Sequence, residues 1–298
     1  MRRSGNSGGR IGPSLQKSWD RRAAANFIAG GCGSGLAILS SANALWSGNL
    51  EPSAFAAAAV LIALGLLFVW FEIGRPWRFL HVFFHPQTSW MTREAALAPP
   101  LLVALAATAL SANRAAAAAS ALLALAFLAT QARILRAARG IPAWREPLIQ
   151  PLILSTGLAE GAGAALLFFA FAPVSERLFL SVLALAAVAL RQFAWRFYCR
   201  RLESRGAPKG ALAALQAIDK PVLWAATLAP FLFLLATFAF PLFAAPFAVT
   251  AGVSAIFGGV LIKGVIVTRA AFNQGFALPD LPGLAGTGGG ASTRPGRS

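Results

Sequence analysis

Eight apolar runs, most of them roughly twenty residues long and almost free of charge, dominate this chain of 298 residues. An α-helix needs about 20 apolar residues to cross the hydrocarbon core of a bilayer, where every backbone polar group must be paired internally. Only 12% of the residues are charged, which is too few for the surface of a soluble domain of this size. We therefore predict an all-α integral membrane protein with eight transmembrane helices, at 23–46, 54–73, 94–112, 115–134, 149–172, 177–198, 219–240 and 247–268.

The segments around these runs divide the chain into three parts. We expect a basic cytoplasmic tail at 1–22, an eight-helix membrane domain at 23–272 and a flexible, glycine-rich and proline-rich tail at 273–298. The first run is longer than the apolar part of a signal peptide, so we interpret it as a span. Its small residues at 30–35 favour close packing against another helix. A nucleotide-binding loop is the other interpretation of these glycines, and we reject it because no strand precedes them and no P-loop lysine follows.

The basic residues are strongly biased toward one side of the predicted membrane domain. Of 26 Lys and Arg residues, all but Arg114 and Arg177 fall in the two tails, in three longer connections or at span ends on the same side. The positive-inside rule then places both termini in the cytoplasm and predicts a multi-pass protein of the cytoplasmic (inner) membrane. This sorting explains the net charge of +16 without a nucleic-acid partner. We expect Lys263, near the end of the last span, to extend to the cytoplasmic edge.

The connection between the second and third spans, EIGRPWRFLHVFFHPQTSWMTRE, holds both histidines of the chain together with acids, arginines and tryptophans. Two histidines in one loop cannot ligate two haems, and Cys32 and Cys199 are too few and too far apart for an iron–sulfur cluster. A quinone site needs no bound metal: it needs a hydrogen-bond donor, a proton-exchanging group and an apolar slot. The candidate quinone-binding residues are Glu72, Arg75, Trp77, Arg78, His81, His85, Trp90, Arg93 and Glu94. Anchoring at the membrane interface is the other interpretation of the arginines and Trp77.

Three further features of the sequence are candidates for a functional or structural role: an acid within a span, a pair of arginines and a helix cap. Glu160 lies in the fifth span among glycines, where an acid is either a proton-path residue or a protonated, hydrogen-bonded helix contact. Arg133 and Arg136 are spaced to share a helix face, which can meet lipid phosphate or the acidic surface of a partner. Thr92 is expected to cap the third span.

The stretch 72–94 resembles the loop after the second helix in the membrane anchors of molybdenum oxidoreductases, the NrfD/PsrC group and the dimethyl sulfoxide reductase anchor DmsC. The residues at matching positions are Glu72, Gly74, Pro76, Ser89, Trp90, Arg93 and Glu94. The likeness covers most of residues 20–275, and the closing VTRAAFNQGFALP is similar to phenylacetyl-CoA:acceptor oxidoreductase membrane subunits. The resemblance implies two four-helix bundles, a quinone pocket near this loop, a four-cluster iron–sulfur subunit and a molybdopterin catalytic subunit.

The sequence departs from this pattern at two positions. Glu72 stands where dimethyl sulfoxide reductase anchors carry His, and Thr92 replaces Ser. We expect a quinone-reactive anchor without haem or iron–sulfur of its own, exchanging electrons between a cytoplasmic enzyme and menaquinone or ubiquinone. Whether the chain itself counts as catalytic stays open. The alternatives are a small-molecule transporter, with Glu160 in its substrate site, and a purely structural anchor.

Overall fold

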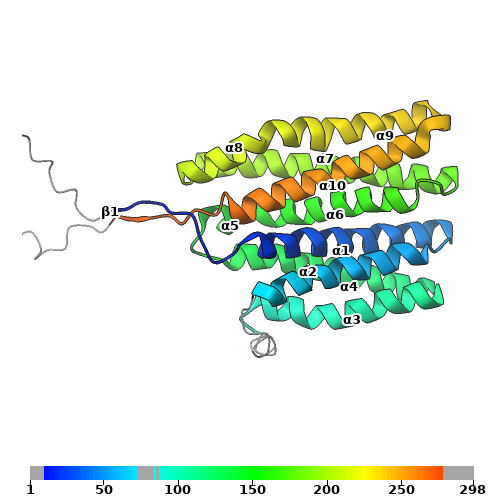
Figure 1. Cartoon of the computed structure of the whole chain (residues 1–298), viewed down its shortest axis with the longest axis horizontal. Coiled ribbons are helices and arrows are strands. Elements are labelled where there is room, and N and C mark those ends of the chain that lie inside the picture. Colours follow the sequence, from blue (N-terminus) through cyan, green and yellow to red (C-terminus); the bar gives the residue numbers. More distant parts are fainter. Residues whose placement is uncertain (1–9, 73–83, 85–86, 278–298) are drawn as a thin grey trace, which may run out of the picture.

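The computed structural model describes residues 10–72, 84 and 87–277, and its long axis runs along a set of nearly parallel helices (Figure 1). Eight units in this described part are long and apolar enough to cross a membrane, which confirms the all-α integral membrane class and the eight predicted spans. The helices are α1 (Arg21–Ser47), α2 (Pro52–Glu72), α3 (Trp90–Ser111), α4 (Arg114–Ala137), the short α5 (Pro142–Arg145), α6 (Ile149–Phe168), α7 (Val174–Ser204), α8 (Lys209–Leu223), α9 (Ala229–Ala239) and α10 (Ala244–Thr268).

The seventh and eighth spans are composite. A π-helical turn, Trp224–Leu228, joins α8 to α9, and a 3₁₀ turn, Pro241–Phe243, precedes α10. Pro221 lies inside α8 and Pro230 follows the π-helical turn, so the backbone hydrogen bonds of the seventh span are interrupted twice in its middle.

The helix boundaries differ from the prediction mainly at the end of the molecule that carries the termini. The third span begins at Trp90, because the Ser89 hydroxyl accepts from Thr92 N at 3.3 Å and caps the helix. The prediction that Thr92 is the cap is therefore wrong. Glu94 consequently lies a full turn inside α3 and points into the bundle.

The contacts between the spans group them into two bundles of four helices, and Figure 1 shows these bundles lying side by side. The first bundle contains α1 to α4, and the second contains α6, α7, the α8–α9 unit and α10. Each bundle has the same arrangement: its first helix packs on its second and fourth, and its third lies against the fourth. The two first helices, α1 and α6, pack on each other and join the halves. This repetition is what a duplicated four-helix unit produces.

The contact between α1 and α6 is built from glycines four residues apart on both helices, Gly31 and Gly35 facing Gly157 and Gly161. A Cβ atom on Gly35 would overlap the backbone of Gly157, and one on Gly161 would overlap the backbone of Gly35. Small residues at this spacing let helix backbones touch within a membrane, where packing and not water exclusion drives association. The predicted packing role of the first span is confirmed here.

The two ends of the described part of the chain are joined to each other beyond the bundles. Strand β1 (Arg10–Ile11) pairs antiparallel with β2 (Phe276–Ala277), and Asn273 N donates to Ser14 O at 2.9 Å. The segment that we expected to be a flexible tail from 273 onward thus begins with paired backbone. The rest of that tail, 278–298, and residues 1–9 lie outside the described residues.

Candidate functional site

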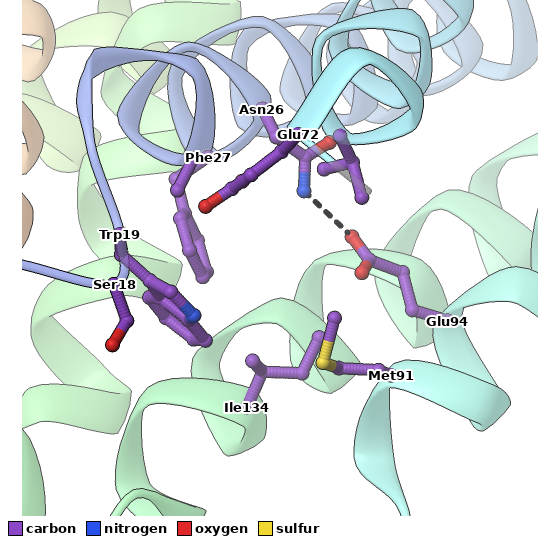
Figure 2. A pocket seen from close by; sticks show the side chains of 10 residues that line it. Ser18, Trp19, Asn26, Phe27, Glu72, Met91, Glu94 and Ile134 are labelled. Atoms are coloured by element: carbon purple, nitrogen blue, oxygen red, sulfur yellow. Dashed lines mark hydrogen bonds between the residues drawn. The ribbon is translucent and has the colours of Figure 1, made fainter. Parts of the chain in front are cut away.

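A pocket of about 310 Å³ lies at the end of the first bundle nearest the chain termini (Figure 2). The segment before α1, the first turns of α1, the end of α2 and the start of α3 bound it, with one residue from α4. Its apolar lining comes from Trp19, Ala23, Phe27, Val69, Met91 and Ile134, and its polar lining from Ser18, Asn26, Glu72 and Glu94. A mainly apolar pocket with a few convergent polar groups is typical of a small-molecule site.

The inner wall of the pocket is a carboxylate held by two amides. Glu94 is only 6% exposed, and Asn26 Nδ2 donates to its Oε1 at 3.5 Å, the dashed line in Figure 2. The Gln131 side chain lies beside the same carboxylate, and its Nε2 donates to Asn26 O at 3.4 Å. Within the described part of the chain, Asn26 Oδ1 and Gln131 Oε1 are buried without a hydrogen-bond partner. The cluster therefore has unused acceptors for a ligand hydroxyl or a water molecule.

The outer wall is aromatic and rigidly placed. The Trp19 ring lies 4.8 Å from the Trp144 ring and 6.0 Å from the Phe27 ring, centroid to centroid. Gln16 fixes the backbone of Trp19 from both sides, because Trp19 N donates to Gln16 Oε1 at 2.8 Å and Gln16 Nε2 donates to Trp19 O at 2.6 Å. Asp20 then begins α1 by accepting from Arg22 N at 2.7 Å, and the hydrogen bonds from Arg22 lower the pKa of this exposed carboxyl.

Two of the predicted quinone-site residues line this pocket. Glu72, the last residue of α2, and Glu94 come from the two ends of the predicted stretch and line the same cavity. Trp90 does not line it: the guanidinium carbons of Arg93 and Arg133 lie 4.1 Å and 5.1 Å from the centre of its ring. The other predicted residues, Arg75, Trp77, Arg78, His81 and His85, lie outside the described residues.

The arginines proposed for partner contact remain on the surface at the same end of the molecule. Arg133 and Arg136 are both exposed, one turn apart near the end of α4. Arg136 Nη1 donates to Gln150 Oε1 at 2.8 Å, and Arg133 lies over Trp90. Both side chains thus contact the chain itself while keeping part of their surface free for phosphate or carboxylate.

Residues that the sequence reasoning missed form much of the pocket. Asn26 and Gln131 are amides within otherwise apolar spans, and such residues tend to face a polar interior, so a signal existed for them. Trp19 and Met91 carried no such signal, because tryptophan and methionine at a membrane edge are usual in any membrane protein.

A second polar cluster, which we call the charged cluster, lies in the second bundle and consists of Glu160 in α6, Arg191 in α7 and Lys263 in α10. All three are 0% exposed. Lys263 Nζ lies 2.5 Å from Glu160 Oε2 and donates to Phe27 O at 2.8 Å. Arg191 donates to Ala255 O at 2.7 Å and to Ala226 O in the π-helical turn. Among the described residues, Glu160 Oε1 and Arg191 Nε have no partner.

The expected position of Lys263 at the cytoplasmic edge is wrong. Glycines leave room for its side chain inside the molecule: a Cβ on Gly31 would collide with Lys263 Nζ, and one on Gly259 would collide with the Glu160 carboxylate. Glu160 is accordingly a charged partner between helices and not an isolated acid in lipid. The sequence contained both residues, but 103 positions separate them and no spacing rule connects them.

No protein-family model matches the chain, and no curated protein matches it. Groups of three or more His, Cys, Asp or Glu side chains placed to hold a metal ion are absent from the described residues. The pocket and the charged cluster are therefore interpreted from their own geometry.

Proposed function

We propose that this chain is the quinone-reactive membrane anchor of a multi-subunit oxidoreductase. In this proposal it passes electrons between a cytoplasmic iron–sulfur and molybdopterin enzyme and the membrane quinone pool. The observation that carries the proposal is the pocket that Glu72 and Glu94 line together with aromatic side chains. Its volume of about 310 Å³ suits a quinone ring, with the prenyl tail left in the bilayer.

The residues of the pocket match the demands of quinone chemistry. Reduction adds two electrons and two protons, one proton to each carbonyl oxygen, and the iron–sulfur partner supplies the electrons. The buried Glu94, when protonated, donates to one carbonyl oxygen, and the Asn26 amide supplies a further hydrogen bond. Glu72 is only partly buried and exchanges protons with the aqueous side, while Trp19 and Phe27 hold the ring.

The distribution of charge supports a partner on the side of the termini. Basic residues gather at that end, and an acidic partner surface approaching it is attracted and oriented. Arg133 and Arg136 lie on this surface beside the pocket residue Ile134. By the positive-inside rule this side is the cytoplasm, so we place both termini and the partner enzyme there.

The charged cluster extends the proposal into the membrane. Lys263 donates to the carbonyl of Phe27, the residue whose side chain lines the pocket, and binds Glu160 on its other side. Glu160 Oε1 is a buried acceptor without a partner among the described residues, as expected of a site visited by a proton or a water molecule. We assign Glu160 to a proton path that begins at the pocket.

The test is the conservative pair Glu94→Gln and Glu72→Gln. We expect Glu94→Gln to lower quinone-coupled turnover of the purified complex about a hundredfold or more, because the amide cannot transfer a proton. We expect Glu72→Gln to have a smaller effect, since water can replace it. Binding of a quinone analogue to the isolated chain is read from quenching of tryptophan fluorescence.

The matched control is Glu51→Gln, which removes an acid at the opposite end of α2. It should leave both turnover and analogue binding at the wild-type level. Unchanged turnover in Glu94→Gln, or a wild-type chain that binds no quinone analogue, would contradict the proposal.

Transport of a small molecule is the second candidate, and one observation favours it. The third span of each half contains helix-disfavouring features: Pro99 and Pro100 lie within the continuous helix α3, and the π-helical turn interrupts the seventh span. In the second half, Arg191 binds a carbonyl of that turn, as in sites where unwound backbone faces a substrate. Substrate-dependent counterflow in vesicles containing the chain alone would support transport, which an anchor subunit does not perform.

A further inference from the structure

The end of α7 and the start of α8 form a helical hairpin that reaches beyond the hydrocarbon layer. Helix α7 has 31 residues, so it is about 46 Å long, against a hydrocarbon core of about 30 Å. Its excess length lies on the side of the termini, where α8 begins at Lys209. Between the two helices of this hairpin lies a groove of about 330 Å³, where α7 becomes rich in arginine after its apolar stretch.

The polar lining of the groove has an excess of positive charge. Its ionisable residues are Arg196, Arg200, Lys220, Glu203 and Asp219, and the Gln216 amide lies beside them. Asp219 is already neutralised, because Arg196 Nη1 donates to its two oxygens at 2.9 Å and 2.8 Å and Trp195 Nε1 donates at 3.0 Å. In the described part of the chain, Arg200 and Lys220 make no ion pair. Glu203 makes no ion pair there either, so the three cations and two acids of the lining leave a net charge of +1, and Arg200 and Lys220 lie beside an amide donor.

Exposed aromatic side chains continue from this groove toward the membrane centre. Trp224 follows Lys220 by one helical turn and is 65% exposed, and Phe193 precedes Arg200 by two turns and is 64% exposed. Residues four and seven positions apart lie on the same helix face. Each wall of the groove thus carries a cation and, nearer the membrane centre, an aromatic ring.

We propose that this groove binds the headgroup of an anionic phospholipid. Arg200, Lys220 and Gln216 bind the phosphate, and Phe193 and Trp224 contact the first part of the acyl chains. Basic pockets between membrane helices at the cytoplasmic side are suited to such headgroups. An acidic protein segment would use the cations but not the aromatic rings, which face lipid. The site lies in the second bundle, apart from the pocket of the first, and does not depend on the proposed quinone chemistry.

The test measures lipid binding to the delipidated full chain in detergent. Phosphatidylglycerol and phosphatidylcholine are titrated separately, and bound lipid is counted by native mass spectrometry. We expect one tightly bound phosphatidylglycerol. The double variant Arg200→Gln/Lys220→Gln should bind it roughly thirtyfold more weakly, because each cation near a membrane surface contributes about fivefold. Phosphatidylcholine, which has no net charge, should show no such site.

The matched control is Arg139→Gln/Lys209→Gln, which removes two exposed charges at the same end but outside the groove. It should bind phosphatidylglycerol like the wild type. A second variant, Trp224→Ala, distinguishes a lipid site from a site for free phosphate. It should weaken the binding of phosphatidylglycerol, and inorganic phosphate should compete with the bound lipid as it does in the wild type. Equal affinity in Arg200→Gln/Lys220→Gln and the control would overturn the proposal, and so would a groove that binds inorganic phosphate as tightly as lipid.

Discussion

At the scale of single residues, Lys263 and Glu160 decide how the centre of the molecule is held. Removing both charges from water costs free energy that their mutual attraction and one carbonyl bond offset only in part. Arg191 adds a second buried cation in the same bundle, so the formal charges of the three side chains do not sum to zero. An apolar core would be the more stable solution here. Three buried charges are what a role in moving or binding charge would require, and the proton path proposed for Glu160 is such a role.

The first prediction concerns this pair. Lys263→Met leaves Glu160 buried without its partner, and Glu160→Gln leaves Lys263 without its own. We expect the single variants to lose about 3–5 kcal/mol of stability toward denaturing detergent. The double variant should recover most of that loss, since neither charge of the pair is then left buried without its partner. Unfolding followed by circular dichroism measures each stability, and additive losses in the double variant would show that the two side chains are not coupled.

At the scale of helices, the seam between α1 and α6 depends on the absence of side chains. Gly35 and Gly161 face each other across it, and a larger residue at either position must push the two bundles apart. We expect Gly161→Val to destabilise the chain by several kcal/mol and to loosen the neighbouring contact of Glu160 in α6 with Lys263 in α10, because Lys263 also donates to Phe27 O in α1. Gly264→Ala is the control, because a Cβ there meets nothing within 4 Å. Equal unfolding midpoints of the two variants would argue against a close-packed seam.

The helices also show how far the sequence alone can predict this protein. Apolar length fixes the eight spans, and the small residues of the first span identify a packing face, because both follow from the bilayer acting as solvent. The pairing of Lys263 with Glu160 and the meeting of Asn26 with Glu94 could not be predicted, since they depend on which helices become neighbours. Glu72 and Glu94 are predicted as site residues because they lie at the two ends of one unusually polar connection between spans.

At the scale of the whole molecule, the repeated four-helix arrangement leaves two unequal ends. An even number of spans per half brings the starts of both halves, the paired termini and most basic residues to one end. The pocket, the groove between α7 and α8 and the exposed Arg133 and Arg136 are all at this end. The opposite end contains the short connections with Arg114 and Arg177. Both proposals therefore depend on which side of the membrane this end faces.

The orientation of the chain in the membrane can be tested at two exposed serines, which end long helices at opposite ends of the molecule. Ser204 ends α7 at the end with the termini, and Ser111 ends α3 at the other. We expect a membrane-impermeant maleimide to label Ser111→Cys in intact cells and to label Ser204→Cys only after permeabilisation, since positive residues keep their end in the cytoplasm. The wild type, with Cys32 buried and Cys199 partly buried, sets the background. Labelling in the reverse order would place the pocket outside the cell and exclude a cytoplasmic electron-donating partner.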